Sequence, residues 1–270
     1  TRQLSVALVG AGSMGGALLR GWLSSGTIDP EKSSVVDPGA DKSLKKLAYD
    51  TGLALNPDPA EIHADALVLA VKPQAAAAVL PAYKDVAKSA IVVSVMAGTS
   101  LTSLARMLSN PPRTARAMPN LPASIGAGVT GLYAPPTLNA AGREVVDRLM
   151  AAVGETVWVD SEKAIDIVTA VSGSGPAYYF LLTEALAEAG AALGLEKDAA
   201  LKLARATAAG AGAMLSADPR APGDMRKAVT SPGGTTAAAL GVLDGDEKAV
   251  RKLLNAAVAA AAKRAGELTE

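Results

Sequence analysis

The chain has 270 residues, and its 26 basic and 26 acidic side chains give a formal net charge of zero, which argues against a nucleic-acid-binding protein. The absence of cysteine and the presence of one histidine, His63, exclude a disulfide framework, a thiolate zinc site and a multi-histidine metal site, so no metal centre is expected. No apolar stretch of about 18 residues and no signal-peptide pattern is present, so we expect no membrane contact and a soluble, cytoplasmic protein.

Short apolar runs alternate with helical patterns through the first 160 residues. The predicted helices are Ser13–Ser25, Asp41–Thr51 and Leu138–Met150. The predicted strands are Leu4–Val9, Ser33–Asp37, Ala66–Val71, Ile91–Val95, Thr114–Met118, Gly128–Tyr133 and Glu155–Val159. Continuous apolar strands separated by helices indicate an α/β domain over residues 1–160, built on a parallel sheet that is covered on both faces.

From Ser161 onward the pattern is helical, without a convincing strand. The predicted helices are Glu162–Val171, Pro176–Leu193, Lys197–Ser216, Pro222–Val229, Thr236–Asp244 and Glu247–Leu268. Residues 161–270 therefore read as an all-α domain. The glycine-rich stretch before Pro176 reads as a helix start, with Ser174 or Gly175 near the cap and Pro176 in the first turn.

The helical half is rich in alanine, and the whole chain has 58 alanines but only 8 aromatic residues. Several of its helices are apolar nearly all round, which is usual for buried helices. A single layer of helices has little interior, so we expect burial against a second subunit. The alternative is that alanine serves only its high helix propensity.

The most informative local motif is the turn Gly10-Ala-Gly-Ser-Met-Gly15, which follows a predicted strand and opens a predicted helix. In a dinucleotide-binding fold, the first glycine permits the tight turn, the second lets the backbone approach the pyrophosphate, and the third lets the helix pack on the strand. The unpaired N–H groups of the helix N-terminus then hold the pyrophosphate. An ordinary glycine turn is the alternative, but the strand and helix on either side favour a cofactor site.

Asp37 ends the second predicted strand, 22 residues after Gly15. A carboxylate at this place can accept a hydrogen bond from the ribose 2′-OH of NAD, and it repels the 2′-phosphate of NADP unless a cation compensates. Lys42 is the nearest following cation. The motif therefore makes NAD(H) usable and leaves NADP(H) open, and a plain turn aspartate before Pro38 is the other interpretation.

Four further segments carry polar or glycine-rich residues that local structure does not demand. They are Lys72-Pro73, Arg116–Asn120, Thr169–Ala177 and Val229–Thr236. Together with GAGSMG, the sequences AVKP, RAMPN, TAVSGSGPAYYF and VTSPGGTT make the whole chain resemble pyrroline-5-carboxylate reductase, the last enzyme of proline biosynthesis. The VTSPGGTT segment is the most specific of these, since many dehydrogenases share the first.

This resemblance implies a Rossmann-type dinucleotide-binding domain followed by an all-α dimerisation domain. It implies NADPH- or NADH-dependent reduction of 1-pyrroline-5-carboxylate to L-proline, by a homodimer that can assemble further into a decamer. Residues that match the family's cofactor site are Gly10, Gly12, Ser13, Met14 and Gly15 at the pyrophosphate, Asp37 and Asn56 at the adenosine, Ala70, Val71, Lys72 and Pro73 along the cofactor, and Met118, Pro119 and Asn120 at the nicotinamide. Those that match its substrate site are Ser231, Gly233, Gly234, Thr235 and Thr236.

Hydride transfer to a C=N bond requires few catalytic side chains, because the nicotinamide supplies the hydride. The chain offers no convincing His, Cys or Lys acid, so the Thr236 hydroxyl is our candidate donor of a hydrogen bond to the ring nitrogen. The glycine turn before Thr236 can bind a carboxylate through backbone N–H groups, and a simple helix N-cap is the alternative interpretation.

Two other functions remain to be weighed. A 3-hydroxyacid dehydrogenase of the same architecture resembles this pattern, but its catalytic lysine and asparagine would fall at Tyr179 and Thr183. A non-catalytic dinucleotide-binding regulator would keep the N-terminal glycines without needing VTSPGGTT. His63 lies in a polar loop and is expected to be a solvated side chain, with no part in catalysis.

Overall fold

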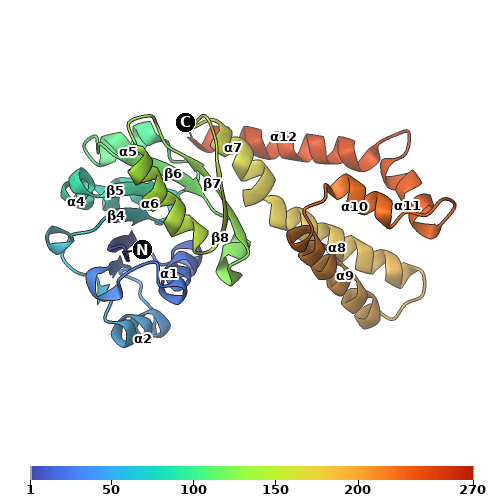
Figure 1. Cartoon of the computed structure of the whole chain (residues 1–270), viewed down its shortest axis with the longest axis horizontal. Coiled ribbons are helices and arrows are strands. Elements are labelled where there is room, and N and C mark those ends of the chain that lie inside the picture. Colours follow the sequence, from blue (N-terminus) through green and yellow to red (C-terminus); the bar gives the residue numbers. More distant parts are fainter. Residues whose placement is uncertain (1, 270) are drawn as a thin grey trace. The chain divides into compact units, whose positions relative to one another are not determined.

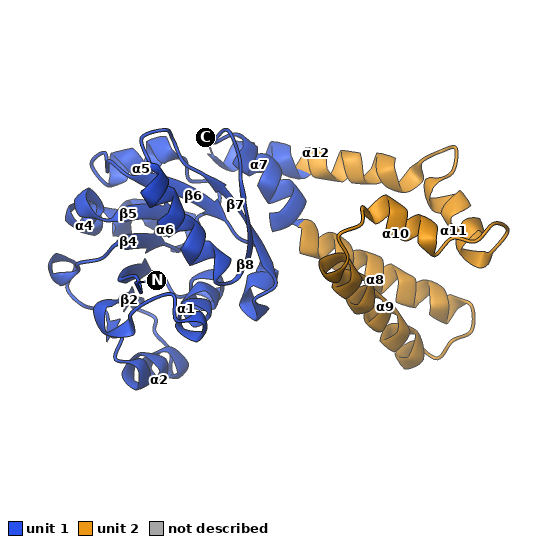
Figure 2. Ribbon diagram, in the orientation of Figure 1, with its two compact units in different colours: residues 1–174, 261–270 blue, residues 175–260 orange. Residues whose placement is uncertain are grey.

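The computed structural model describes residues 2–269, and these form two compact units (Figure 2). The first unit comprises residues up to Ser174 together with the C-terminal stretch from Ala261, and the second comprises Gly175–Ala260. The expected fold class is confirmed, because an α/β unit with an eight-stranded sheet is followed by an all-helical unit.

The sheet of the first unit has the strand order β3-β2-β1-β4-β5-β6-β7-β8. Figure 1 labels the strands β4 to β8. The strands are β1 (Val6–Val9), β2 (Ser34–Val36), β3 (Ala54–Leu55), β4 (Ala66–Leu69), β5 (Ile91–Ser94), β6 (Thr114–Met118), β7 (Gly128–Tyr133) and β8 (Gly154–Trp158). The helices of this unit are α1 (Ser13–Ser25), α2 (Lys42–Thr51), α3 (Pro73–Val79), α4 (Lys84–Ser89), α5 (Leu101–Met107), α6 (Ala140–Ala151) and α7 (Ala164–Val168).

Each central strand places alternate residues in two separate hydrophobic cores. Val6 and Leu8 of β1 pack in the core that includes α1 and α6, whereas Ala7 and Val9 pack in the core that includes α3, α4 and α5. Trp22 of α1 is fully buried in the first core, and its indole N–H donates to the Leu149 carbonyl at 2.7 Å. The strands are continuously apolar because both of their faces are covered.

The sheet departs from the expected parallel pattern at β7, which pairs antiparallel with β6. The connection between them contains only a short 3-10 segment, η4 (Leu121–Ile125). A parallel crossover needs about a dozen residues or more, so this short connection turns the chain back. The two-residue strand β3 is too short to carry an alternating pattern and was not expected.

The second unit contains α8 (Gly175–Ala192), α9 (Lys197–Ala217), α10 (Pro222–Ala228), α11 (Thr235–Asp244) and the first part of α12 (Ala249–Thr269). Within residues 175–260, only Gly175, Ala200 and Ala204 are buried. Large apolar side chains are exposed instead, including Tyr179 at 66%, Val242 at 77% and Leu253 at 70%. One copy of this unit therefore lacks a hydrophobic core of its own.

The expected helix start near Ser174 and Gly175 is confirmed, with Pro176 in the first turn of the helix, but Ser174 lacks the extended geometry of an N-cap. After α7 the chain forms a π-helical turn, η5 (Thr169–Gly173), and α8 begins at Gly175. Ser174 has helical dihedral angles (φ −84°, ψ −20°), and its N–H donates to the Thr169 carbonyl five residues earlier, at 2.8 Å. The glycine-rich sequence therefore forms a π-helical turn directly before the new helix α8.

Candidate functional site

The three glycines of the N-terminal turn meet different surroundings. Gly10 has a φ of +92°, and a Cβ there would lie 2.7 Å from the Ala70 carbonyl oxygen. A Cβ on Gly15 would lie 2.1 Å from the Gly10 carbonyl oxygen. Gly12, by contrast, has no heavy atom within 4 Å of a built Cβ. Packing therefore demands glycine at the first and third positions, whereas the second faces open space.

Helix α1 begins directly after this turn, with Gly12 as its N-cap. No side chain caps the helix, and its first turn holds no acidic residue. The first N–H groups of a helix have no partner within the helix, and they carry the positive end of the helix dipole. The open space at Gly12 and the uncapped N–H groups at Ser13, Met14 and Gly15 fit the pyrophosphate of a dinucleotide.

Asp37 lies just after β2 and binds this turn directly. Its carboxylate accepts the Ala11 N–H at 2.9 Å and the Gly39 N–H at 2.8 Å. Asn56 holds the same residue from the other side, because its carbonyl oxygen accepts the Asp37 N–H at 2.7 Å and its amide nitrogen donates to the Asp37 carbonyl at 3.1 Å. Asn56 adopts a left-handed conformation (φ 52°). These contacts place both predicted adenosine-side residues next to the glycine turn.

The remaining cofactor candidates lie where β4 and β6 end. Ala70 and Val71 follow β4 and are half-buried, Lys72 is the exposed N-cap of α3, and Pro73 is its first residue. Met118 and Pro119, at the end of β6, are buried. Because β1, β4, β5 and β6 run parallel, these ends share one edge of the sheet with Gly10. Ligands meet parallel sheets at this edge.

Sequence reasoning missed the residues between these two groups. The strand order places β5 between β4 and β6, so Val95 and Met96, which follow β5, belong to the same edge. Gly98 lies in this connection with a φ of +65°, and a Cβ there would lie 2.7 Å from the Leu268 carbonyl oxygen of α12. A signal for them is present in the sequence. Ile91–Val95 is predicted as a strand of the same parallel sheet, and the carboxyl ends of parallel strands lie at one edge.

The predicted substrate residues form a compact turn within the second unit. The Gly234 N–H donates to the Ser231 carbonyl at 3.0 Å, and Gly233 has a φ of +70°. Proline in the second position and a left-handed glycine in the third are typical of a type II turn. A Cβ on Gly234 would lie 2.4 Å from the Ser231 Oγ, so a larger residue there would displace this hydroxyl.

Helix α11 starts immediately after this turn, with Gly234 as its N-cap. No side chain caps it, and its first turn holds no acidic residue. Thr235 is exposed and Thr236 is half-buried, and neither hydroxyl bonds to another residue among 2–269. This end of α11 offers N–H groups for a carboxylate and hydroxyl groups for a ring nitrogen.

An ion-pair network that the sequence did not reveal fixes the other end of α11. Asp244 accepts from Arg226 of α10 at 2.6 Å and from Arg251 of α12 at 2.5 and 2.7 Å. Hydrogen bonds from Arg251 and then Arg226 lower the pKa of the Asp244 carboxyl to about 2. The network ties together three helices of the second unit, α10, α11 and α12.

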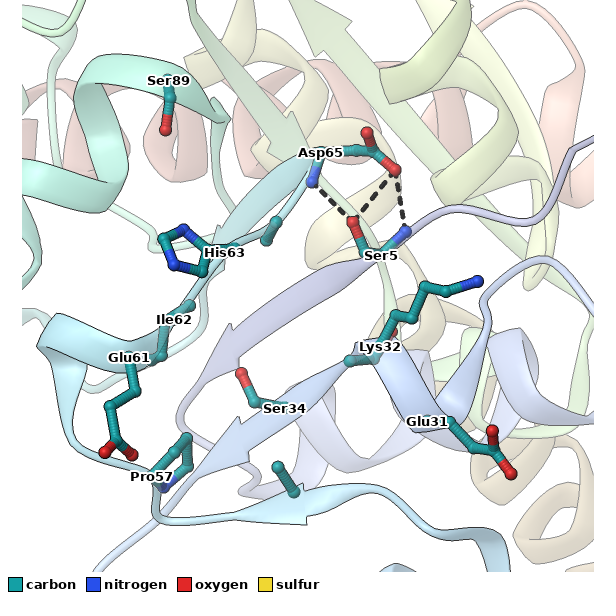
Figure 3. Close-up of a pocket in the computed structure, with 13 residues that line it drawn as sticks. Ser5, Glu31, Lys32, Ser34, Pro57, Glu61, Ile62, His63, Asp65 and Ser89 are labelled. Atoms are coloured by element: carbon teal, nitrogen blue, oxygen red, sulfur yellow. Dashed lines mark hydrogen bonds between the residues drawn. The ribbon is translucent and has the colours of Figure 1, made fainter.

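Two hollows of the first unit lie at the opposite edge of its sheet. One of about 580 Å³ is lined by residues at the amino ends of β1, β2 and β4, among them Ser5, Ser34 and His63 (Figure 3). Asp65 at its rim accepts from the Ser5 N–H at 2.9 Å and from its Oγ at 3.0 Å. A second hollow of about 430 Å³ is lined by Arg2, Asn139 and other residues of this edge. Neither contains a predicted site residue, so shape alone does not mark the site.

The structure therefore brings all predicted cofactor residues together at one edge of the first unit, and all predicted substrate residues together at one end of α11. Among residues 2–269, no group of three or more His, Asp or Glu side chains is placed to hold a metal ion. No helix in the same range is long and apolar enough to cross a membrane. A dinucleotide-binding edge and a helical unit of this kind define an NAD(P)-dependent oxidoreductase of the Rossmann class.

Comparisons with known proteins narrow this class. Residues 5–98 match a family described as NADP oxidoreductase coenzyme F420-dependent, and residues 162–268 match one described as pyrroline-5-carboxylate reductase dimerisation. The pyrroline-5-carboxylate reductase of Pseudomonas aeruginosa is 41% identical, over 98% of this chain and 97% of its own. The chain belongs to the pyrroline-5-carboxylate reductase family.

Solved structures agree with this placement over the full length. A pyrroline-5-carboxylate reductase from Coxiella burnetii is 35% identical with a TM-score of 0.92, and the match covers 100% of both chains. A Plasmodium falciparum pyrroline carboxylate reductase with NADP bound is 27% identical with a TM-score of 0.81, over 99% of this chain and 98% of its own. The family resemblance expected from the sequence motifs is confirmed.

Proposed function

We propose that the chain carries out its family's reaction, the NAD(P)H-dependent reduction of the C=N bond of 1-pyrroline-5-carboxylate to L-proline, through the residues described above. The observation that carries this proposal is a pair of uncapped helix N-termini, each preceded by a glycine turn. The one at α1 suits a pyrophosphate, and the one at α11 suits a carboxylate. A reductase of a small imino acid needs both kinds of site.

On the cofactor side, each residue group binds a different part of the dinucleotide. Gly10, Gly12, Ser13, Met14 and Gly15 hold the pyrophosphate, Asp37 meets the adenosine ribose, and Asn56 lies on the adenine side. Ala70, Val71, Lys72 and Pro73 lie along the cofactor, and Met118, Pro119 and Asn120 shape the nicotinamide side. Bound NAD(P)H supplies the hydride, so the protein's task here is to orient the ring and exclude water.

On the substrate side, Ser231, Gly233, Gly234 and Thr235 form the carboxylate site, through hydroxyls and the backbone N–H groups that the turn leaves free. The Gly234 N–H is bonded to the Ser231 carbonyl and shapes the turn. The Thr236 hydroxyl donates a hydrogen bond to the ring nitrogen, which is protonated in the product. No other residue among 2–269 bonds to this hydroxyl, and its availability supports this role. The fixed dipole of the Thr236 hydroxyl then stabilises the charge that develops at the nitrogen.

We further propose that NADH is a usable cofactor alongside NADPH. The Asp37 carboxylate accepts two backbone N–H groups, and its remaining lone pairs can accept a ribose hydroxyl. The same negative charge opposes a 2′-phosphate. The nearest following cation, Lys42, is exposed, so compensation there is weak.

Assembly and domain roles complete the proposal. We assign dinucleotide binding to residues 1–160, and substrate binding and dimerisation to residues 161–270, supported by the two family matches. The exposed apolar side chains of the second unit support a homodimer, and further assembly of dimers into a decamer is part of the same proposal. We place the enzyme in the cytoplasm, where reduced dinucleotides and amino-acid precursors are available.

The decisive experiment follows NADH or NADPH oxidation at neutral pH with 1-pyrroline-5-carboxylate, and proline-dependent NAD⁺ reduction at high pH. Turnover in the first assay supports the proposal. Turnover of a 3-hydroxyacid alone, or dinucleotide binding without turnover of any cyclic imine, would overturn it.

A further inference from the structure

Asn120 ends the RAMPN segment, and its side chain joins three parts of the first unit. Its amide nitrogen donates to the Ser172 carbonyl at 3.2 Å, and its carbonyl oxygen accepts the Val129 N–H at 2.9 Å. The residue is 8% exposed. Since one partner is an acceptor and the other a donor, only one orientation of the amide satisfies both. The end of β6 is thereby bonded to β7 and to the π-helical turn η5.

The sequence explains why the Ser172 carbonyl is available. In an α-helix this carbonyl would accept from the N–H of residue 176, which is a proline and has none. The π-helical bond from Ser174 to Thr169 shows that the ladder is already out of α-helical register here. Asn120 supplies the hydrogen bond that Pro176 cannot.

Tight packing around this bond leaves the neighbouring backbone little freedom. A Cβ on Gly128 would lie 2.8 Å from the Ala123 Cα, and a Cβ on Gly131 would lie 2.4 Å from a methyl carbon of Val168. The segment η4, strand β7 and helix α7 are therefore in close contact on either side of Asn120. In such packing, a lost hydrogen bond shifts a whole segment and is not absorbed locally.

We propose that Asn120 is a positioning residue for hydride transfer, which fixes Met118 and Pro119 by bonding the end of β6 to the Ser172 carbonyl that Pro176 leaves free. This inference rests on the proposed function, because it takes Met118 and Pro119 as the nicotinamide side of the site. The two motifs then act together: RAMPN supplies the donor, the Asn120 amide, and SGSGP supplies the acceptor, the Ser172 carbonyl.

The test uses Asn120→Asp, which keeps the acceptor for Val129 but loses the donor to Ser172. Asn139→Asp is the matched control, because the exposed Asn139 only accepts, from the Gly142 N–H. Asn120→Ser is a second variant that removes both bonds without adding charge. Pro176→Ala restores a backbone N–H that can donate to the Ser172 carbonyl. This substitution is tested alone and in combination with Asn120→Asp.

The first readout is amide hydrogen exchange of residues 169–174 in the protein without cofactor. We expect faster exchange in Asn120→Asp and wild-type exchange in the control. We expect the effect of Asn120→Asp to shrink in the Pro176→Ala background. Equal effects in both backgrounds, or no change in exchange, would overturn the inference even if the enzyme is inactive for another reason.

The second readout separates positioning from mere stability. We expect kcat of Asn120→Asp to fall about tenfold to a hundredfold, with the KM for the imine within twofold. The isotope effect on kcat with C4-deuterated NADH should rise, because hydride transfer becomes slower. A lowered Tm with unchanged kcat and isotope effect would mean a structural role only. Inactivity of the wild type would reject the proposed function, whereas a defect confined to the variants would support the inference.

Discussion

Replacing Gly12 by alanine should separate cofactor binding from folding. In the folded chain an added Cβ meets no atom within 4 Å, and the residue has a φ of −63° that alanine adopts freely. The weaker N-cap and the reduced entropy of the unfolded chain oppose each other, and each amounts to about 0.5–1 kcal/mol. We therefore expect the free energy of unfolding to change by less than about 1 kcal/mol.

The effect of Gly12→Ala on dinucleotide binding should be much larger. The new methyl group would stand in the open space through which the pyrophosphate approaches the N–H groups of α1. We expect the Kd for NADH to rise at least tenfold, which corresponds to about 1.4 kcal/mol. Gly10→Ala is the matched control, since it combines a φ of +92° with a Cβ only 2.7 Å from the Ala70 oxygen. It should cost about 1–3 kcal/mol of stability.

The assay combines thermal unfolding without nucleotide, at a fixed protomer concentration, with NADH binding followed by fluorescence. Gly12→Ala should keep its Tm and lose affinity, whereas Gly10→Ala should lose several degrees of Tm. The reasoning is refuted if Gly12→Ala binds NADH as tightly as wild type. It is also refuted if Gly10→Ala unfolds at the wild-type temperature.

Three further predictions concern other parts of the site. Asp37→Ser should move the kcat/KM ratio about tenfold toward NADPH, and a strong NADPH preference already present in wild type would contradict this. Thr236→Ala should lower kcat/KM about tenfold to a thousandfold in steady-state kinetics, and unchanged kinetics would remove Thr236 from the mechanism. The third uses pH. Because the folded pKa of Asp244 is about 2 and the unfolded value is about 4, its ion pairs stabilise the fold above pH 4. The Tm difference between wild type and Asp244→Asn should be constant above pH 5 and shrink as the pH falls from 4 to 2; an equal difference at pH 2 would contradict it.

Much of the first unit could be predicted because its local signals agree with one another. The strands β6 and β7 and the helix α1 have the predicted bounds, since glycine or proline lies at or near their ends. The glycine turn could be interpreted from its spacing together with the predicted strand before it and the predicted helix after it, because all three are local features. Family motifs added the residues at the other strand ends.

What the sequence could not show depends on contacts between distant segments. The hydrogen bond from Asn120 to Ser172 joins residues 52 positions apart, and no local sequence pattern predicts it. The start of α8 at Gly175 could be predicted from its glycine and proline, whereas the π-helical turn Thr169–Gly173 before it could not. Likewise, Asp244 lies 18 residues from Arg226 and 7 from Arg251, and no local pattern predicts these ion pairs.

The helical unit makes folding and assembly depend on one another. Within residues 175–260, nearly every large apolar side chain is at least partly exposed, and full burial of one leucine contributes about 1.5–3 kcal/mol. The turn that holds Thr236 belongs to this unit, so its geometry relies on helices that have no core in a single copy. A partner that covers these side chains stabilises the folded unit by mass action. Imine reduction should therefore fall on dilution together with helical order, because both follow from the same association equilibrium.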